Sequence, residues 1–456
     1  MKRKKGWAWG ITLALLLSLL GGCSSGGNNA ATSGGNTGNG GNAGNAPSAG
    51  DSGEPVTLRF SWWGGEDRHA ATLEAIEAYK KIAPNVTIEA EYQGFDGYEQ
   101  KIKTQLTSGT SADIMQLDLP WVQELVTKGD FFLDLKTMSD FDATGFDPTF
   151  LDNFGVYDGK LVAVPTGVNA YCLIINKTLA DQLGIPADIA WDWDTLYEQG
   201  KKLHEADSGK YLLLADHAAL TQDFRTMLKQ RTGEQWIKED YTVGFAKEDA
   251  AASFEWLQKA MEAGVYQPIG EADLFFGKLD QNPKWINQEM PMTTSMSSTL
   301  PTLKTVLPEG TEIVTALPAI AKDAKNSGVV VRPSQLIAVS KNSKHQEEAV
   351  KFLNWFMNDP DAAVILGGVR SIPPVKSSQE AAVAAGKIDA AITNAVELGL
   401  SHAGLVDNSL SNNSEIGKIL EDVIQKVSYN KSTPDQAADE LIASLTSKLA
   451  EIKDRQ

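Results

Sequence analysis

Tryptophans and carboxylates gather at two places where predicted strands end. Trp62 and Trp63 are adjacent at the end of a strand predicted over 56–62, and Asp118 and Trp121 follow a strand predicted over 113–117. Aromatic faces stack on the C–H faces of sugar rings, whereas carboxylates, amides and Arg bond to sugar hydroxyls. These residue types at strand ends indicate a carbohydrate-binding cleft.

The adjacent pair Trp62 and Trp63 points to opposite faces of its strand, so at most one of them belongs to a core. We expect the other to be a sugar platform. Gly64 and Gly65 let a ligand approach the backbone, and Arg68 and His69 follow at the start of the next helix, where backbone N–H groups are exposed. The alternative is that both tryptophans pack inside the protein beside a charged helix cap.

A second polar cluster follows a strand predicted over 212–215. Asp216 and His217 end this strand and are expected to reach the cleft, with Trp236 as a further partner. An alternative role for Asp216 is the N-cap of a helix that begins near residue 220.

The elements that position these side chains alternate between strand-like and helix-like patterns, which predicts α/β layers with mainly parallel sheets. The 400 or so residues after the N-terminal segment exceed what one core serves, so two lobes are expected. Strands are predicted over 56–62, 86–92, 113–117, 161–164, 171–176, 212–215, 290–294, 313–317 and 335–339, and helices over 70–82, 97–108, 347–358, 415–427 and 434–452.

The N-terminus has the pattern of a lipoprotein signal. Four cations in residues 2–5 precede an apolar run over 7–20 that is too short for a membrane span, and Leu20-Gly21-Gly22-Cys23 matches a lipobox. We expect Cys23 to carry a diacylglycerol, and the Gly/Asn/Ser-rich residues 24–54 to form a flexible tether. The alternative is a free Cys behind an ordinary secretion signal.

Composition excludes several classes of function. The chain carries 59 acidic and 41 basic residues, which argues against nucleic acid as a partner. Apart from Cys23 only Cys172 is present, so no disulfide is expected, and the five histidines include no pair at metal-ligand spacing. We expect no cofactor and no metal.

The order of several stretches resembles the family 1 extracellular solute-binding proteins of carbohydrate ABC importers, which are maltose-binding-protein-like. The resemblance covers nearly all of residues 55–452. The stretches that carry it are Ser61–Gly65, Gly94–Tyr98 with Asp96, Gly109–Met115 leading to Asp118 and Trp121, Tyr157–Lys160 continuing to Asn176, Thr315–Pro318, Phe352–Phe356 and Ile372–Pro374.

This resemblance implies a type II periplasmic-binding-protein fold whose two lobes are joined by three chain crossings, near 164–170, 316–321 and 371–375. Lobe 1 would comprise 55–165 and 319–370, and lobe 2 would comprise 166–318 and 371–456, with the C-terminal helices packing on both lobes. The ligand-contacting positions that it adds are Asn169, Tyr171, Ser295, Arg370 and Asp407. Relatives often carry a stacking Trp where Ser295 and Met296 stand, so malto-oligosaccharide specificity does not transfer.

The function that follows is capture of a sugar or oligosaccharide between two lobes and its delivery to an ABC permease and its ATPase, without catalysis. We expect a monomer, lipid-anchored on the extracytoplasmic face of a bacterial membrane, with Gram-positive features. The alternatives are a binding protein for a polyol or sugar phosphate, a secreted glycoside hydrolase, a metal or siderophore receptor, and an adhesin.

Overall fold

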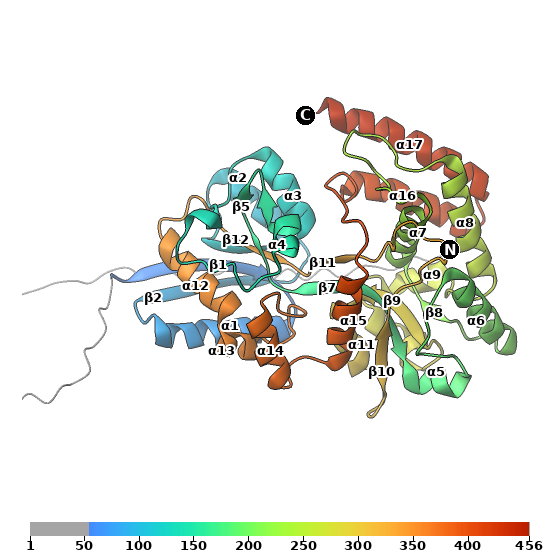
Figure 1. Ribbon diagram of the computed structural model, residues 1–456, viewed down its shortest axis with the longest axis horizontal. Helices are drawn as coiled ribbons and strands as arrows, with labels where there is room; N and C mark the ends of the chain where they lie inside the picture. The colour runs from blue at the N-terminus through green and yellow to red at the C-terminus, as the bar shows by residue number, and fades with distance from the viewer. Residues whose placement is uncertain (1–53, 456) are drawn as a thin grey trace, which may run out of the picture. The chain divides into compact units, whose positions relative to one another are not determined.

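The computed structural model describes residues 54–455 (Figure 1). Cys23, the signal segment and nearly all of the tether lie outside the described residues, so the predictions made for them stay predictions. Within 54–455 no helix combines the length and the apolar character that a membrane span needs. The described chain builds two main sheets, each with its own helices, which we call lobe 1 and lobe 2.

Lobe 1 is built on a sheet of order β2-β1-β3-β12-β6. β1 pairs in parallel with both β2 and β3, whereas β12 is antiparallel to its two neighbours. Its strands are β1 (Val56–Trp63), β2 (Val86–Gln93), β3 (Ile114–Leu117), β6 (Val164–Pro165) and β12 (Leu336–Val339), with a small hairpin of β4 (Val156–Tyr157) and β5 (Lys160–Leu161) beside them. Each of the longer predicted strands of this lobe is confirmed to within two residues.

The helices of lobe 1 follow its strands or return late in the chain. They are α1 (Glu66–Ile82), α2 (Tyr98–Ser108), α3 (Leu119–Lys128), α4 (Pro148–Gly155), α12 (Gln346–Asn358), α13 (Pro360–Leu366) and α14 (Lys376–Ala384). The start of α3 has a clear local cause: the Asp118 carboxylate accepts a hydrogen bond from the N–H of Leu119, and Pro120 occupies the first turn. This cap directs the chain away from the sheet immediately after β3.

Lobe 2 is built on a sheet of order β10-β7-β9-β8, with β11 also paired to β7. Its strands are β7 (Val168–Asn176), β8 (Leu213–Leu214), β9 (Met292–Met296), β10 (Ile313–Ala316) and β11 (Val331–Pro333). The prediction of mainly parallel sheets is wrong here, because β7 runs antiparallel to β9, β10 and β11. Alternating strand and helix patterns do not encode strand direction, which depends on how distant segments return to the sheet.

The helices of lobe 2 are α5 (Lys177–Leu183), α6 (Trp193–Ala206), α7 (His217–Thr232), α8 (Lys247–Glu262), α9 (Ile269–Ala272), α10 (Pro283–Ile286), α11 (Leu300–Thr305), α15 (Ala390–Ser401), α16 (Ser414–Ser428) and α17 (Pro434–Asp454). α17 packs on α8 and α16, which both belong to lobe 2. The apolar face of α17, with Leu441 and Leu445, is covered by the lobe 2 core, and the expectation that the C-terminal helices as a group pack on both lobes stays a prediction.

We propose that the chain passes between the lobes where β6 leads into β7, within the range 164–170 that the resemblance implies. Strand pairing places the second passage between β11 and β12, later than the predicted 316–321, because β11 still pairs with β7. The third passage follows α14, later than the predicted 371–375, because α14 packs on α13 and α12 of lobe 1. We accordingly propose lobe boundaries at 166–167, 334–335 and 385–389.

Candidate functional site

An aromatic cluster lies at the carboxyl ends of β1 and β3. Trp63 and Trp121 have ring centroids 5.0 Å apart, and Tyr98 lies 5.2 Å from Trp63. Phe95, in the loop between β2 and α2, completes this lobe 1 aromatic cluster, with its ring stacked 5.7 Å from Trp121 and edge-on 5.7 Å from Trp63. Strand ends thus bring together aromatic side chains from four separate segments.

Phe95 is the member of this cluster that faces solvent. It is 57% exposed, whereas Trp63 and Trp121 are only 7% and 5% exposed and Tyr98 is fully buried. Trp63 and Trp121 therefore lie behind Phe95, and the Phe95 ring is the aromatic surface that a ligand could contact. Sequence reasoning missed Phe95, although its position beside the exposed Asp96 and ahead of Gly97, which has a φ of 75°, marks an exposed loop tip.

Trp62 belongs to the core of lobe 1. Its fully buried indole Nε1–H donates to Nδ1 of His69 at 3.1 Å. Burial lowers the pKa of His69, which favours the neutral imidazole that this acceptor role requires. Arg68 donates from Nε to the Val369 carbonyl and from Nη1 to the Trp63 carbonyl, both at 3.0 Å. The structure gives Trp62, His69 and Arg68 partners within the protein, and leaves Trp63 as the one of the pair that faces the cluster.

Arg370, predicted from its place before a crossing, lies inside lobe 1. Its Nε donates to Gln116 Oε1 and its Nη2 to Thr72 Oγ1, both at 3.0 Å, and its guanidinium lies 5.5 Å from the Phe356 ring centroid. Only 4% of the residue is exposed. The structure thus engages Arg370 inside lobe 1, and its predicted ligand contact stays a prediction.

Asp407 and Trp236 form part of a buried charged network in lobe 2. The Asp407 carboxylate pairs with Arg225 Nη2 and with Lys229 Nζ, each at 2.7 Å. The Arg225 guanidinium in turn lies 5.0 Å over the buried Trp236 ring. Burial raises the pKa of Asp407, but the two cations outweigh it and hold this pKa below its usual value. Trp236 is therefore a core residue, and Asp407 is first of all the counter-ion of two cations.

Asp118 keeps acceptor capacity for a ligand. It is half-buried, and its Oδ1 caps α3 by accepting from the Leu119 N–H at 2.8 Å. Its Oδ2 has no hydrogen-bond partner among residues 54–455. The predicted ligand contact of Asp118 stays a prediction, and this geometry leaves one oxygen free for it.

A hollow of about 460 Å³ opens on lobe 2 and brings together three predicted positions, Tyr171, Asp216 and Ser295. We call it the lobe 2 hollow. Its wall also includes residues that sequence reasoning missed, namely Gln222, Phe276, Asp280 and Arg332. They come from α7, a loop, a short 3-10 helix over Leu279–Gln281 and the three-residue strand β11, which have no common sequence pattern. Aromatic, amide, carboxylate and guanidinium groups are the mixture expected of a carbohydrate site.

Two predicted residues at this hollow serve the fold as well. Asp216 is the N-cap of α7, as the alternative reading held, and accepts from the Ala219 N–H at 3.0 Å, while burial raises its pKa. His217 donates from Nδ1 to Asp273 Oδ1, 3.0 Å away, and its ring stacks on Phe276 at 4.4 Å. His217 thus fixes the orientation of Phe276, which is 52% exposed.

The strand β7 supplies Asn169 and Tyr171 to the same face. The Asn169 side chain is fully engaged with the turn after β9, since Oδ1 accepts from Ser297 Oγ and the Ser298 N–H, and Nδ2 donates to Ser298 Oγ. Asn169 therefore positions that turn. The Tyr171 hydroxyl donates to Asp223 at 3.4 Å, and burial raises the pKa of Asp223 to about 7.

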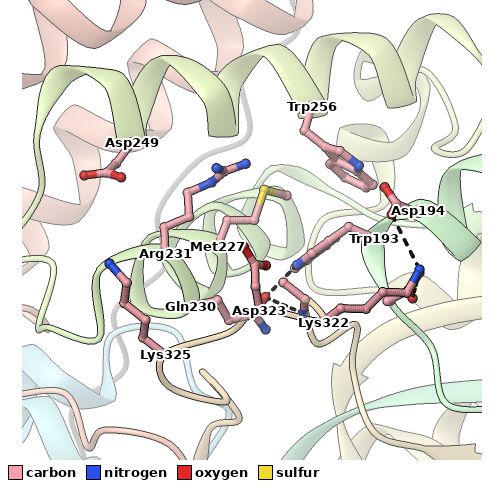
Figure 2. A pocket seen from close by; sticks show the side chains of 12 residues that line it. Trp193, Asp194, Met227, Gln230, Arg231, Asp249, Trp256, Lys322, Asp323 and Lys325 are labelled. Atoms are coloured by element: carbon pink, nitrogen blue, oxygen red, sulfur yellow. Dashed lines mark hydrogen bonds and ion pairs between the residues drawn. The ribbon is translucent and has the colours of Figure 1, made fainter.

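Two further hollows differ in what lines them. One of about 720 Å³ lies between the lobes, with α3 of lobe 1 on one side and residues 406–409 of lobe 2, including Asp407, on the other. The other, of about 470 Å³, is drawn in Figure 2 and lies within lobe 2, beside Trp193 and Trp256. None of the predicted site residues lines it, and Lys322 there is paired with Asp192 and Asp194. We assign the candidate site to the lobe 1 cluster and the lobe 2 hollow.

Comparison with known proteins agrees with this architecture. Residues 63–363 match the family model described as bacterial extracellular solute-binding protein. The chain belongs to this family. Within the described residues no cluster of His, Cys, Asp and Glu could hold a metal ion.

Solved structures of the family share the fold over almost their whole length. A periplasmic solute-binding protein of Pectobacterium atrosepticum is 27% identical, with a TM-score of 0.80 over 87% of this chain and 99% of that one. An oligogalacturonide-binding protein of Yersinia enterocolitica, solved with saturated digalacturonic acid, is 25% identical, with a TM-score of 0.77 over the same shares. An ABC substrate-binding protein of Listeria monocytogenes, solved with cycloalternan, is 18% identical, with a TM-score of 0.70 over 87% and 100%. The type II two-lobed fold is thereby confirmed, and all three are binding proteins.

Proposed function

We propose that this solute-binding protein captures an oligosaccharide between lobe 1 and lobe 2, hands it to an ABC permease, and performs no catalysis. The observation that carries the proposal is the exposed Phe95 face, backed by Trp63 and Trp121, at the strand ends of one lobe, together with the polar hollow of the other. An oligosaccharide ligand in the Yersinia relative supports the same class of ligand here.

In this proposal Phe95 stacks on a sugar ring and Asp118 Oδ2 accepts from a sugar hydroxyl, while Tyr171, Asp216, Gln222 and Ser295 bind hydroxyls from lobe 2. The ligand would shift the population from the open form to the closed form, to the extent that it binds the closed form more tightly than the open one.

The segments at 166–168, 335 and 372, where the two lobes adjoin, are suited to such a motion, because they are hydrogen-bonded to one another. The Thr166 N–H donates to the Gln335 carbonyl at 2.9 Å, and the Val168 N–H donates to the Ile372 carbonyl at 2.8 Å. Three short segments far apart in sequence thus share a few backbone hydrogen bonds. A change in φ and ψ at these residues would move the lobes as bodies.

The test is a thermal-shift screen of the full-length chain against mono- and oligosaccharides, polyols and sugar phosphates. At a ligand concentration of about 100 times Kd, linkage predicts about 2.7 kcal/mol of stabilisation. Phe95→Ala should weaken binding of the identified sugar roughly 10-fold, the value of one aromatic contact, with little change in stability. Tyr429→Ala is the matched control, because Tyr429 is similarly exposed, at 52%, on α16's C-terminal side.

A stabilising shift that is confined to polyols or to sugar phosphates would mean that the ligand is a solute of that class and not a sugar. Turnover of a saccharide during the assay would contradict a purely binding role and favour a glycoside hydrolase. No shift from any of these compounds would refute the proposal.

We further propose that Cys23 carries the lipid that anchors the protein on the extracytoplasmic face of the membrane, and that the protein acts as a monomer. Replacing Cys23 by Ser should move the protein from the detergent phase to the aqueous phase in a Triton X-114 partition and abolish incorporation of labelled palmitate. Retention of the label in the Ser variant would contradict lipidation at this residue.

A further inference from the structure

Arg332 occupies an unusual place in the lobe 2 hollow. It lies on β11 directly opposite Asn169 of β7, with Val331 and Pro333 on either side. Val331 and Pro333 are buried, and Val331 faces α15. Because side chains alternate along a strand, Arg332 projects to the other face, which carries Asn169 and Tyr171.

This position is also at the junction of the lobes. Arg332 lines the lobe 2 hollow, and it lines a second, narrow hollow of about 40 Å³ that includes Leu119 and Phe154 of lobe 1. Arg332 is therefore the residue that both hollows share.

The Arg332 guanidinium has no anionic partner in the described part of the chain. Its Nε is buried and donates to no acceptor there. Asn169, directly opposite on β7, offers it no free acceptor, because Asn169 Oδ1 already accepts two hydrogen bonds. Arg332 is thus left with unused donors facing the hollow.

Two other enclosed arginines have partners for some of their donors, since Arg370 bonds to Gln116 and Thr72 and Arg225 pairs with Asp407. Arg370 Nη1 and Arg225 Nε are also buried without a partner among the described residues, but neither of these arginines lines the lobe 2 hollow. A buried guanidinium donor without a partner is costly, and the strongest partner for its planar fork is a carboxylate bound through two parallel hydrogen bonds. Since the chain has a net charge of −18, a local cation is also what an anionic ligand needs to enter a hollow on an acidic protein.

The other charged groups of the hollow fit a ligand that carries both a carboxylate and hydroxyls. Asp216 and Asp280 line the same hollow, and carboxylates there accept from hydroxyls but repel a polyanion. One cation between two acceptors suits a single carboxylate on a sugar ring better than a phosphate with two charges.

We propose that the lobe 2 hollow selects a uronic-acid residue of the ligand and that Arg332 binds its carboxylate. This inference rests on the proposed capture of an oligosaccharide. The specificity-determining residue is Arg332, and Asp216, Gln222 and Tyr171 receive the hydroxyls of the same sugar ring.

The experiment is isothermal titration of the full-length chain with digalacturonic acid and with a glucuronate-containing disaccharide, each compared with its methyl ester. The ester keeps the shape of the sugar and removes the charge. We expect at least one acid to bind roughly 10- to 100-fold more tightly than its ester, which is the worth of a charge-assisted hydrogen-bonded pair. The affinity of that acid, and not of its ester, should fall as NaCl is raised.

Arg332→Gln should reduce the affinity for the acid to about that of the ester and change binding of the ester less than about 3-fold. Arg332→Lys keeps the charge and loses the planar fork, so its affinity for the acid should lie between those of the unaltered chain and of Arg332→Gln. Arg231→Gln is the matched control, because Arg231 lines the separate hollow of Figure 2 and should leave both affinities unchanged. Thermal melting of each variant checks that it is folded.

The outcomes separate this inference from the proposed function. If neutral oligosaccharides bind and neither uronate binds more tightly than its ester, the role of Arg332 is overturned and sugar capture stands. The role of Arg332 is also overturned, and sugar capture stands, if an acid is preferred but Arg332→Gln leaves that preference intact. If the chain binds no saccharide, acidic or neutral, both the role of Arg332 and the proposed sugar capture are overturned. The salt dependence of the unaltered chain keeps the test decisive even if an Arg332 variant does not fold.

Discussion

Replacing Asp407 by Asn removes the counter-ion of two buried cations in lobe 2. The side chains of Asp407, Arg225 and Lys229 are 11%, 14% and 1% exposed, and both cations lie 2.7 Å from the carboxylate. In the variant Lys229 keeps only the Leu405 carbonyl, 3.1 Å from its Nζ, as a partner. Arg225 keeps its place over the Trp236 ring. The main cost therefore falls on Lys229.

The magnitude of that cost is bounded. Breaking a buried ion pair by removing one partner costs about 3–5 kcal/mol. Lys229 can also escape by losing its proton, and burial already lowers its pKa. Deprotonating a lysine of pKa about 10.4 at pH 7 costs at most about 5 kcal/mol, so the penalty cannot greatly exceed that value. We expect Asp407→Asn to lower the free energy of unfolding by about 3–5 kcal/mol at pH 7.

Urea unfolding at pH 7, followed by tryptophan fluorescence, measures this loss as a fall of about 1 M or more in the midpoint. Asp439→Asn is the matched control, because Asp439 pairs with Lys247 at 2.6 Å on the surface and should cost less than about 1 kcal/mol. Adding Lys229→Met to Asp407→Asn should restore most of the loss, since the buried cation is gone.

The reasoning is refuted if Asp407→Asn costs less than about 1 kcal/mol, or if Lys229→Met restores nothing. A variant that keeps its stability and loses sugar affinity would instead support the original prediction that Asp407 contacts the ligand.

Three other predictions concern separate parts of the chain. Burial raises the pKa of Asp223 to about 7 from an ordinary value of about 3.9, so the folded state binds more protons between these pH values. Stability should therefore fall by up to about 4 kcal/mol as pH rises through that window and then level off, and Asp223→Asn should flatten the urea midpoint between pH 5 and 8; an equal slope in both proteins would contradict this. Gly167→Ala would place a Cβ 1.8 Å from the Arg370 carbonyl oxygen, so we expect a loss of about 2 kcal/mol or more by thermal melting, and an unchanged melting temperature would mean that this passage relaxes freely. Thr433→Ala removes the capping box with Gln436 at the start of α17 and should cost about 1 kcal/mol in the urea assay, whereas no change would show that the packing of α17 on α8 alone determines its start.

Local pattern was sufficient for the longer strands and for several of the helices of this protein. The alternation over 56–62 and the helical spacing over 70–82 predict β1 and α1 with small errors at their ends, because hydrophobic period follows from burial of one face. β11 was missed since three residues ending in Pro333 carry no period. Its pairing with β7 moved the second passage between the lobes and placed Arg332 at the hollow.

The candidate site likewise has features that follow from the local sequence and features that only the tertiary structure decided. The sequence alone determined that Trp62 and Trp63 point to opposite faces, that Asp118 ends a strand, and that Asp216 can cap a helix, because these follow from geometry within a few residues. Only the tertiary structure decided that Trp62 is core and that Phe95 presents the platform. It also decided that Arg370 bonds to Gln116 and Thr72 and that Asp407 pairs with two cations, whereas Arg332 has no anionic partner among the described residues. The physical reason is that burial and charge pairing depend on partners hundreds of residues away, such as Gln116 for Arg370, and no local pattern encodes which partner a side chain meets.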